Sequence, residues 1–80
     1  MTVTIAVNGQ QRSVQPGSTV TDLVAEITGR AIATDGHAVD GSRVGVAVAR
    51  NAAVVSRSLW WSTAVTAGDE IEIVTAVQGG

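Results

Sequence analysis

The sequence predicts an α+β domain in which one main helix packs on one face of a mixed sheet of four to five strands. Three observations indicate this fold class. Segments with a two-residue apolar period, typical of half-buried strands, lie near both ends of the chain. A segment between them has the apolar spacing of an amphipathic helix. The length of 80 residues allows one small domain.

A β-hairpin is predicted at the start of the chain. Thr2–Val7 alternates between apolar residues and small or polar ones, which is the pattern of a half-buried strand. Asn8-Gly9 follows directly, and a two-residue hairpin turn favours this dipeptide because both positions need φ > 0. Gln11–Gln15 is the expected return strand. Only Val14 points securely inward in it, which predicts an edge strand.

An amphipathic helix is predicted after the hairpin. Thr19 is the expected N-cap, and Asp22 completes a variant of the capping box and suits the positive end of the helix dipole. Gly29 is expected to end the helix. A helix of about ten residues is not stable alone in water, so its apolar stripe is expected to pack on the sheet. That stripe is Val20, Leu23, Val24 and Ile27.

The second half of the chain supplies the remaining strands. Gly29–Arg43 has the composition of a turn-rich loop, and no element is assigned there. Val44–Ala49 is apolar on both faces, which favours a central strand, and Ala53–Ser56 is a candidate short strand. Leu59–Trp61 is expected as an irregular or 3₁₀ turn that fills the core. Glu70–Val77 alternates again and predicts the last strand. This order of elements is typical of the β-grasp, or ubiquitin-like, fold.

Composition excludes several classes of site. The chain has no cysteine and one histidine, which excludes disulfides, thiolate metal sites, a cysteine nucleophile and a multi-histidine metal site. Five basic residues and a net charge of −2 give no electrostatic footprint for nucleic acid or an anionic membrane. No apolar segment is long enough for a membrane span, and no signal peptide is evident. We therefore expect a cytoplasmic protein. We also expect that it is not an enzyme, because His37 has no recognisable nucleophile partner and is expected in a solvated loop.

The most informative segment is the C-terminal Val77-Gln78-Gly79-Gly80, directly after the predicted last strand. Two residues without Cβ atoms form a thin, flexible end that can enter a slot closed to larger residues. The six residues from Thr75 to Gly80 reach roughly 20 Å when extended. The Gly80 carboxylate can therefore enter another protein's active site and attack the α-phosphate of ATP. We predict one domain over residues 1–80 with residues 77–80 as its functional tail. Because no thiol is present, any sulfur that the chain carries must be bound to the Gly80 carbonyl as a thiocarboxylate.

Several short motifs follow one another along the chain. They are Val7-Asn8-Gly9, Gly17-Ser18-Thr19-Val20 with Asp22-Leu23, Val46-Ala47-Val48-Ala49-Arg50-Asn51, Arg57 with Trp60, Gly68-Asp69-Glu70-Ile71, and Val77-Gln78-Gly79-Gly80. In this order, they resemble the motifs of the ThiS-type sulfur carrier proteins of thiamine biosynthesis. The resemblance covers nearly the whole chain. The main departure is Gly29–Arg43, which is longer than in compact members of the family.

The resemblance implies a function and a set of partners. An E1-like adenylating enzyme of the ThiF type would use ATP and magnesium to adenylate Gly80, so the carrier itself would bind no cofactor. A sulfur donor system, typically starting from a cysteine desulfurase, would convert the adenylate to the thiocarboxylate. A thiazole synthase of the ThiG type would then take up the sulfur. The functional residues that the resemblance carries over are Gly79 and Gly80.

A docking surface is expected beside the tail. If the alternation of the last strand continues, Val74 and Ala76 share its outward face with Glu70 and Glu72. An outward apolar patch next to the tail is what a docking surface needs. An ordinary solvated strand face is the favoured explanation of these two glutamates and Asp69. The functional alternative is an acidic rim that pairs with arginines of the adenylating enzyme.

Two alternatives remain open at the level of sequence. A MoaD-like carrier for molybdopterin, or a carrier for cysteine or other sulfur metabolites, would use the same terminal chemistry. MoaD-like tails usually approach Gly-Gly through a proline, and Thr75–Gln78 contains none, which favours the thiamine interpretation. A β-grasp interaction module with an inert tail is the alternative from another functional class.

Overall fold

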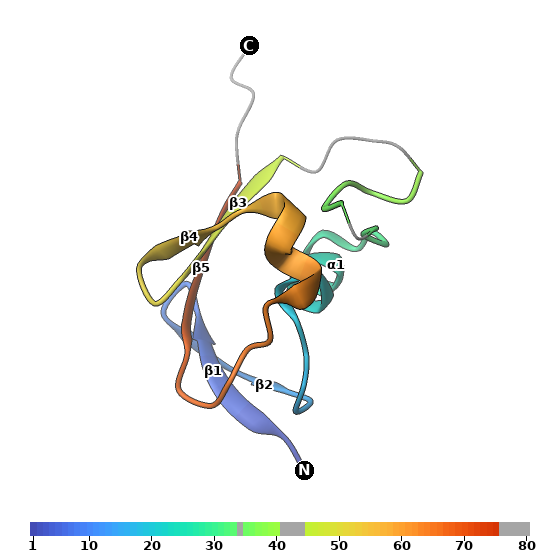
Figure 1. Ribbon diagram of the computed structural model, residues 1–80. Coiled ribbons are helices and arrows are strands. Elements are labelled where there is room, and N and C mark those ends of the chain that lie inside the picture. The colour runs from blue at the N-terminus through green and yellow to red at the C-terminus, as the bar shows by residue number, and fades with distance from the viewer. Residues whose placement is uncertain (34, 41–44, 76–80) are drawn as a thin grey trace.

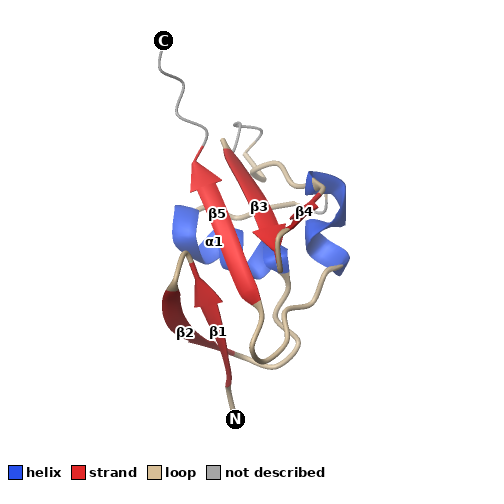
Figure 2. Ribbon diagram, turned by 90° about the vertical axis from the view of Figure 1, so that its left-hand side faces the viewer, coloured by secondary structure: helices blue, strands red, loops and turns tan. Residues whose placement is uncertain are grey.

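The computed structural model describes residues 1–33, 35–40 and 45–75, which form a five-stranded mixed sheet with its helices on one face (Figure 1, Figure 2). This arrangement confirms the predicted α+β, β-grasp fold class, with five strands among the described residues. The elements are β1 (Val3–Val7), β2 (Gln10–Val14), α1 (Val20–Thr28), β3 (Val46–Arg50), β4 (Ala53–Val55), the 3₁₀ helix η1 (Arg57–Ser62) and β5 (Glu70–Thr75).

The last strand occupies the centre of the sheet. The strand order is β2-β1-β5-β3-β4, so β5 lies between β1 and β3. It runs parallel to β1, with Val7 opposite Ile71, and antiparallel to β3, with Val46 opposite Thr75. Parallel neighbours cannot be joined by a tight turn, and the chain between β1 and β5 supplies the long crossover. Figure 2 shows β5 and β3 in front of α1, with the end of β5 pointing away from the N-terminus.

The hairpin at the start of the chain has the predicted turn. Asn8 and Gly9 have φ values of 51° and 82°, as a two-residue turn that follows the twist of the strands requires. β2 begins at Gln10 and pairs with β1 alone, which confirms the predicted edge strand. Val14 is buried, as expected.

The predicted caps stabilise both ends of α1. The backbone N–H of Thr19 donates to the Asp22 carboxylate at 2.9 Å, and the N–H of Asp22 donates back to the Thr19 hydroxyl at 3.3 Å. These two bonds complete a capping box. Gly29 ends the helix in the left-handed conformation, with φ of 71°. The buried residues of the helix are Val20, Leu23 and Val24.

Ile27 was predicted to belong to the same buried stripe, and this prediction was wrong. Its side chain is 42% exposed. The residue lies near the end of α1 and lines an open hollow with Val7 and Gln10. The first hairpin turns back at Asn8, so the β1–β2 ladder goes no further beneath this part of the helix.

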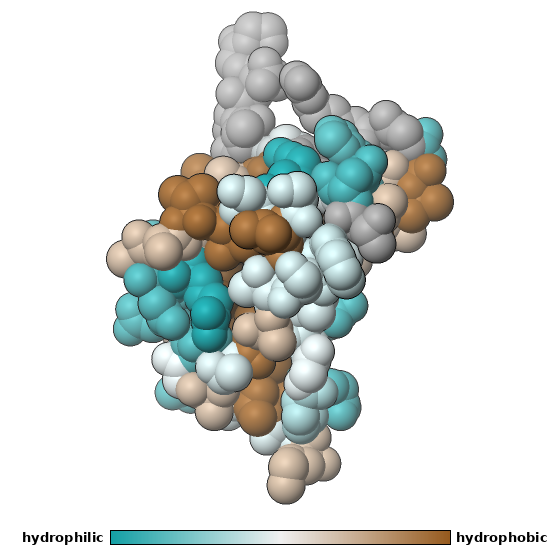
Figure 3. Space-filling model, viewed as in Figure 1, coloured by the Kyte–Doolittle hydropathy of each residue, from teal (hydrophilic) through white to brown (hydrophobic). Residues whose placement is uncertain are grey.

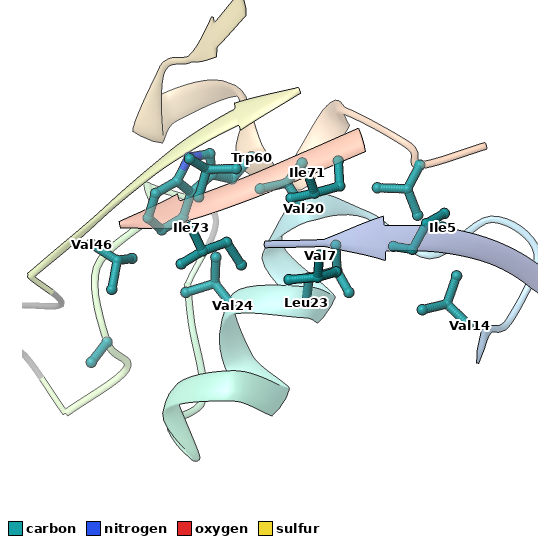
Figure 4. Close-up of a cluster of buried hydrophobic side chains, with 13 residues drawn as sticks. Ile5, Val7, Val14, Val20, Leu23, Val24, Val46, Trp60, Ile71 and Ile73 are labelled. Atoms are coloured by element: carbon teal, nitrogen blue, oxygen red, sulfur yellow. The ribbon is translucent and has the colours of Figure 1, made fainter. Parts of the chain in front are cut away.

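The core lies between the sheet and α1, and Trp60 is its largest side chain (Figure 4). The indole N–H of Trp60 donates to the carbonyl of Val55 at 3.1 Å, which satisfies its polar atom. This placement confirms the predicted 3₁₀ turn that fills the core. Hydrophobic atoms also gather at the surface near β4 and η1, where Val54 and Leu59 are exposed (Figure 3). The core residues are Ile5, Val7, Val14, Val20, Leu23, Val24, Ala38, Val46, Val48, Trp60, Val65, Ile71 and Ile73.

The described part of the Gly29–Arg43 segment has contacts that its composition did not indicate. Ile32 and Ala38 form an isolated β-bridge. The Arg57 guanidinium donates to the carbonyl of Gly36 at 3.1 Å and to that of Val46 at 3.0 Å. It also lies 4.7 Å from the centroid of the Trp60 ring. One arginine thus joins this segment to β3 and to η1.

Candidate functional site

The two faces of β5 differ as the sequence predicts. Ile71 and Ile73 are buried against the helix side, whereas Glu70, Glu72 and Val74 are exposed on the opposite face of the sheet. Val74 is 61% exposed, which is high for an aliphatic side chain in a central strand. The predicted outward orientation of Val74 is therefore confirmed. Figure 2 views the sheet from this side, with the strands in front of the helices.

Neighbouring strands extend the apolar surface around Val74. In the register of the sheet, Ala47 of β3 lies opposite Val74, and Ala49 lies between Glu72 and Val54. Val54 is 82% exposed. We call Ala47, Ala49, Val54 and Val74 the outer patch, with Glu70 and Glu72 along its β5 side. The contribution of β3 and β4 to this surface was not predicted from the sequence. The alternation of Ala47 and Ala49 in β3 could have indicated it.

The remaining candidate residues of the tail lie outside the described part of the structure. These are Ala76, Gly79 and Gly80. The described chain ends at Thr75, which pairs with Val46 at one end of the sheet. Val74 of the outer patch thus lies on the strand that leads into the tail.

Asp69, which was expected to share a solvated acidic rim with the two glutamates, is instead a buried structural residue. Its side chain is 7% exposed. It accepts hydrogen bonds from Arg50 Nε at 2.8 Å, from the backbone N–H of Thr66 at 2.7 Å and from the Asn51 side-chain amide at 3.2 Å. The prediction was wrong because Asp69 immediately precedes β5, where the turn folds its carboxylate inward onto donors from the β3–β4 hairpin.

The donors around Asp69 control its charge state. Burial by itself raises the pKa of this carboxyl, but the hydrogen bonds from Arg50, Thr66 and Asn51 outweigh burial and lower the pKa from 3.8 to about 2. The carboxylate is therefore ionised at neutral pH. Because the Asp69 carboxylate is buried and paired inside the fold, Glu70 and Glu72 are the acidic side chains beside the outer patch in the described part of the chain.

Two asparagines at hairpin turns hold β5 on its two sides. Asn8 lies at the end of β1; its side-chain oxygen accepts from the Ile73 N–H at 2.8 Å, and its amide donates to the Ile73 carbonyl at 3.1 Å. On the other side, the Asn51 side-chain oxygen accepts from the Glu70 N–H at 2.9 Å. Asn8 therefore imitates a peptide group and continues the parallel ladder after β1 has turned away. These bonds position the strand that presents the outer patch.

The described residues offer contact surface and no metal site. An open hollow of about 380 Å³ lies over the start of β5, with Asn8, Ala52, Glu70 and Glu72 in its lining. Within residues 1–33, 35–40 and 45–75, no group of three His, Asp or Glu side chains is placed to hold a metal ion. His37 is half exposed, and its backbone N–H donates to Asp35 at 2.9 Å, in agreement with the expected loop position. No helix in the described ranges is long and apolar enough to cross a membrane.

One helix packed on a five-stranded mixed sheet, with the last strand at its centre, defines a ubiquitin-like β-grasp protein. Comparison with known families then narrows the assignment. A model of the ThiS family matches residues 5–80, and the chain belongs to this family of small sulfur carrier proteins.

Solved structures agree with this assignment. The thiamine biosynthesis protein ThiS from Geobacter metallireducens is 25% identical, with a TM-score of 0.69, over 98% of this chain and 100% of the other. SAMP1 from Haloferax volcanii is 22% identical, with a TM-score of 0.55, over 100% of both chains, and it supports the fold alone. No curated protein matches the chain.

Proposed function

We propose that this protein carries sulfur on Gly80 for thiazole formation in thiamine biosynthesis. The observation that supports this proposal most directly is the ThiS family match, which runs to residue 80 and so includes the terminal Gly79-Gly80 pair. The likeness to a protein described as a thiamine biosynthesis protein, over nearly the whole of both chains, favours the thiamine pathway.

The proposed chemistry has three steps. First, an oxygen of the Gly80 carboxylate attacks the α-phosphorus of ATP, and pyrophosphate leaves. Second, sulfur at the oxidation level of sulfide attacks the acyl carbon; a C–S bond forms, the C–O bond to AMP breaks, and AMP leaves with the electron pair. Third, the thiocarboxylate sulfur forms a C–S bond with the thiazole precursor, the acyl C–S bond breaks, and an oxygen replaces the sulfur on the acyl carbon, which regenerates the Gly80 carboxylate. The carrier is a co-substrate in each step, and the partner enzymes hold ATP and magnesium.

The outer patch is the proposed docking site of an E1-like adenylating enzyme of the ThiF type. Its apolar centre, Val54 and Val74, is exposed on the strands beside the start of the tail. Glu70 and Glu72 lie next to it and would pair with basic residues of the enzyme, which favours rapid association. A thiazole synthase of the ThiG type is the proposed sulfur acceptor.

Intact-mass measurement tests the chemistry. The chain is incubated with a ThiF-type enzyme, Mg-ATP and a sulfur source. We expect a mass gain equal to the replacement of one oxygen by one sulfur, located at Gly80 by fragmentation. A matched sample without ATP should keep its original mass.

Two controls separate the possible failures. Deletion of Gly80 should abolish the mass gain and leave the thermal transition unchanged, because the described core ends at Ile73. The thiocarboxylate could form and support molybdopterin synthesis but not thiazole synthesis. That result would contradict the thiamine assignment and leave the carrier chemistry intact. If the full-length chain gains no sulfur with any ThiF-type enzyme, both the pathway and the carrier chemistry are contradicted.

A further inference from the structure

A second surface lies on the helix side of the molecule, away from the outer patch. β2 is an edge strand, and α1 runs beside it. Two open hollows, of about 240 and 220 Å³, lie between them. An ion pair from Arg12 of β2 to Glu26 of α1 crosses the space that separates the hollows. We call this surface the β2–α1 groove.

The outer edge of β2 carries unpaired backbone groups. The turn at Asn8-Gly9 makes Val7 and Gln10 a hydrogen-bonded pair, because a β-turn joins the carbonyl of its first residue to the N–H of its fourth. Pairs alternate along an antiparallel ladder, so Gln11 and Ser13 direct their N–H and C=O groups away from β1. In the described part of the chain, no backbone hydrogen bond is recorded for these two residues on that side.

The two hollows differ in chemistry. The hollow at the end of β2 lies against Asp22 and Glu26 of α1 and against Val14. Its charged lining is acidic, and Glu26 is 64% exposed despite its pairing with Arg12. The hollow at the start of β2 is lined by Val7 and the half-exposed Ile27, together with Arg12 and the amide side chains of the hairpin, and it has no acidic side chain. One end of the groove therefore favours a cation and the other an aliphatic side chain.

We propose that the β2–α1 groove binds an extended peptide segment of a partner protein, which adds to the sheet as a strand beside β2. Main-chain bonds to Gln11 and Ser13 would give affinity, and the two hollows would select alternate side chains. Antiparallel pairing places the segment's basic residue opposite Val14 and its aliphatic residue opposite Gln10. The two positions are four residues apart, roughly 13 Å in a strand. A small residue is required between them, opposite Arg12, because the ion pair occupies that part of the groove.

Nothing in this proposal depends on the terminal chemistry. The groove uses residues of β2 and α1, whereas the proposed carrier function uses Gly80 and the outer patch. A partner held by the groove would leave the other face of the sheet uncovered.

A synthetic peptide tests the proposal. The probe has seven residues, with lysine at the second position, alanine at the fourth, leucine at the sixth and threonine elsewhere. It is titrated into the whole ¹⁵N-labelled protein, and amide shifts are followed by NMR. We expect saturable shifts centred on Gln11 and Ser13, whose free amides would become hydrogen-bonded. Shifts centred on Val54 and Val74, or none at millimolar peptide, would overturn the proposal.

Two matched changes test the mode of binding. A peptide N-methylated at its third and fifth residues cannot donate to the β2 edge and should no longer bind. Ile27→Asn should weaken binding roughly tenfold by removing an aliphatic contact, whereas Val54→Asn, an exposed valine on the opposite face, should leave it unchanged. Equal affinity for the methylated peptide would overturn strand addition, and equal effects of the two variants would overturn the groove as the site.

Discussion

Asp69 joins the turn before β5 to the β3–β4 hairpin through hydrogen bonds from Arg50 and Asn51. We predict that Asp69→Asn destabilises the protein by about 2 kcal/mol at neutral pH, because the shift of its pKa from 3.8 to about 2 is linked to folding. A pKa that is lowered by folding stabilises the native state fully above 3.8, and this contribution is lost as pH falls towards 2. Denaturant unfolding at several pH values measures it.

The stability difference between wild type and Asp69→Asn should therefore shrink as the pH is lowered through this range. Glu70→Gln provides the matched control, because Glu70 is the neighbouring residue and its carboxylate is exposed. A difference that stays constant down to pH 2 would show that the charge of Asp69 does not contribute.

Gly36 is the second residue with a specific structural requirement. It has φ of 83°, and a Cβ atom there would lie 2.7 Å from the carbonyl oxygen of Arg57 and in contact with its side chain. We predict that Gly36→Ala costs about 2–4 kcal/mol, from backbone strain and overpacking together. Gly17 has nearly the same φ but open space around it, so Gly17→Ala should cost only about 1 kcal/mol. Equal losses in thermal or denaturant unfolding would contradict the predicted clash.

At the scale of elements, β5 depends on a side chain from the turn between β1 and β2. Asn8→Gly keeps the positive φ of the hairpin turn but removes both hydrogen bonds to Ile73. We expect a loss of about 1–2 kcal/mol and much faster hydrogen exchange at the Ile73 amide. The amides of β5 that face β3 serve as internal reference. Unchanged protection of Ile73 would mean that the Asn8 side chain does not act as a substitute for a strand residue.

The opposite faces of β5 supply a direct test of docking. Val74→Asp should leave the free energy of unfolding within about 1 kcal/mol of wild type, because the side chain is exposed. It should lower kcat/KM for adenylation by a ThiF-type enzyme roughly tenfold or more, since a charge would enter an apolar contact. Ile73→Asp, one residue earlier and 8% exposed, should instead prevent folding. Normal adenylation of Val74→Asp would contradict docking on the outer patch.

At the scale of the whole molecule, the described core ends before the proposed carrier terminus begins. Among the residues that the structure describes, the thirteen core side chains run from Ile5 to Ile73. We predict that removing residues 76–80 changes the thermal midpoint by about 1–2 °C at most, because no core side chain of the described residues is lost and we expect a free-energy change well below 1 kcal/mol. Buried Trp60 reports the transition by fluorescence. A large drop in the midpoint would show that the terminal residues contribute to the fold.

Much of the architecture could be predicted from local patterns. The Asn8-Gly9 turn, the Thr19–Asp22 capping box and the alternation of β5 are each specified by neighbouring residues, and each is present in the structure. Local chemistry decides such features because turns, caps and strand faces involve residues a few positions apart. The terminal Gly-Gly pair, to which we assign the proposed carrier chemistry, is also a feature of the sequence, and it stays a prediction because residues 76–80 lie outside the described structure.

Other features depend on contacts between distant segments, and only the tertiary structure decides them. Asp69 is acidic in the sequence, but its partner Arg50 is nineteen positions away, so burial of the pair follows from strand order. Ile27 has the spacing of a core residue but lies where the first hairpin has already turned back, and it remains half exposed. The sequence by itself determined the elements, the faces of β5 and the family. The tertiary structure decided which charged and apolar side chains remain at the surface, because burial depends on what packs against a residue and local periodicity does not specify this.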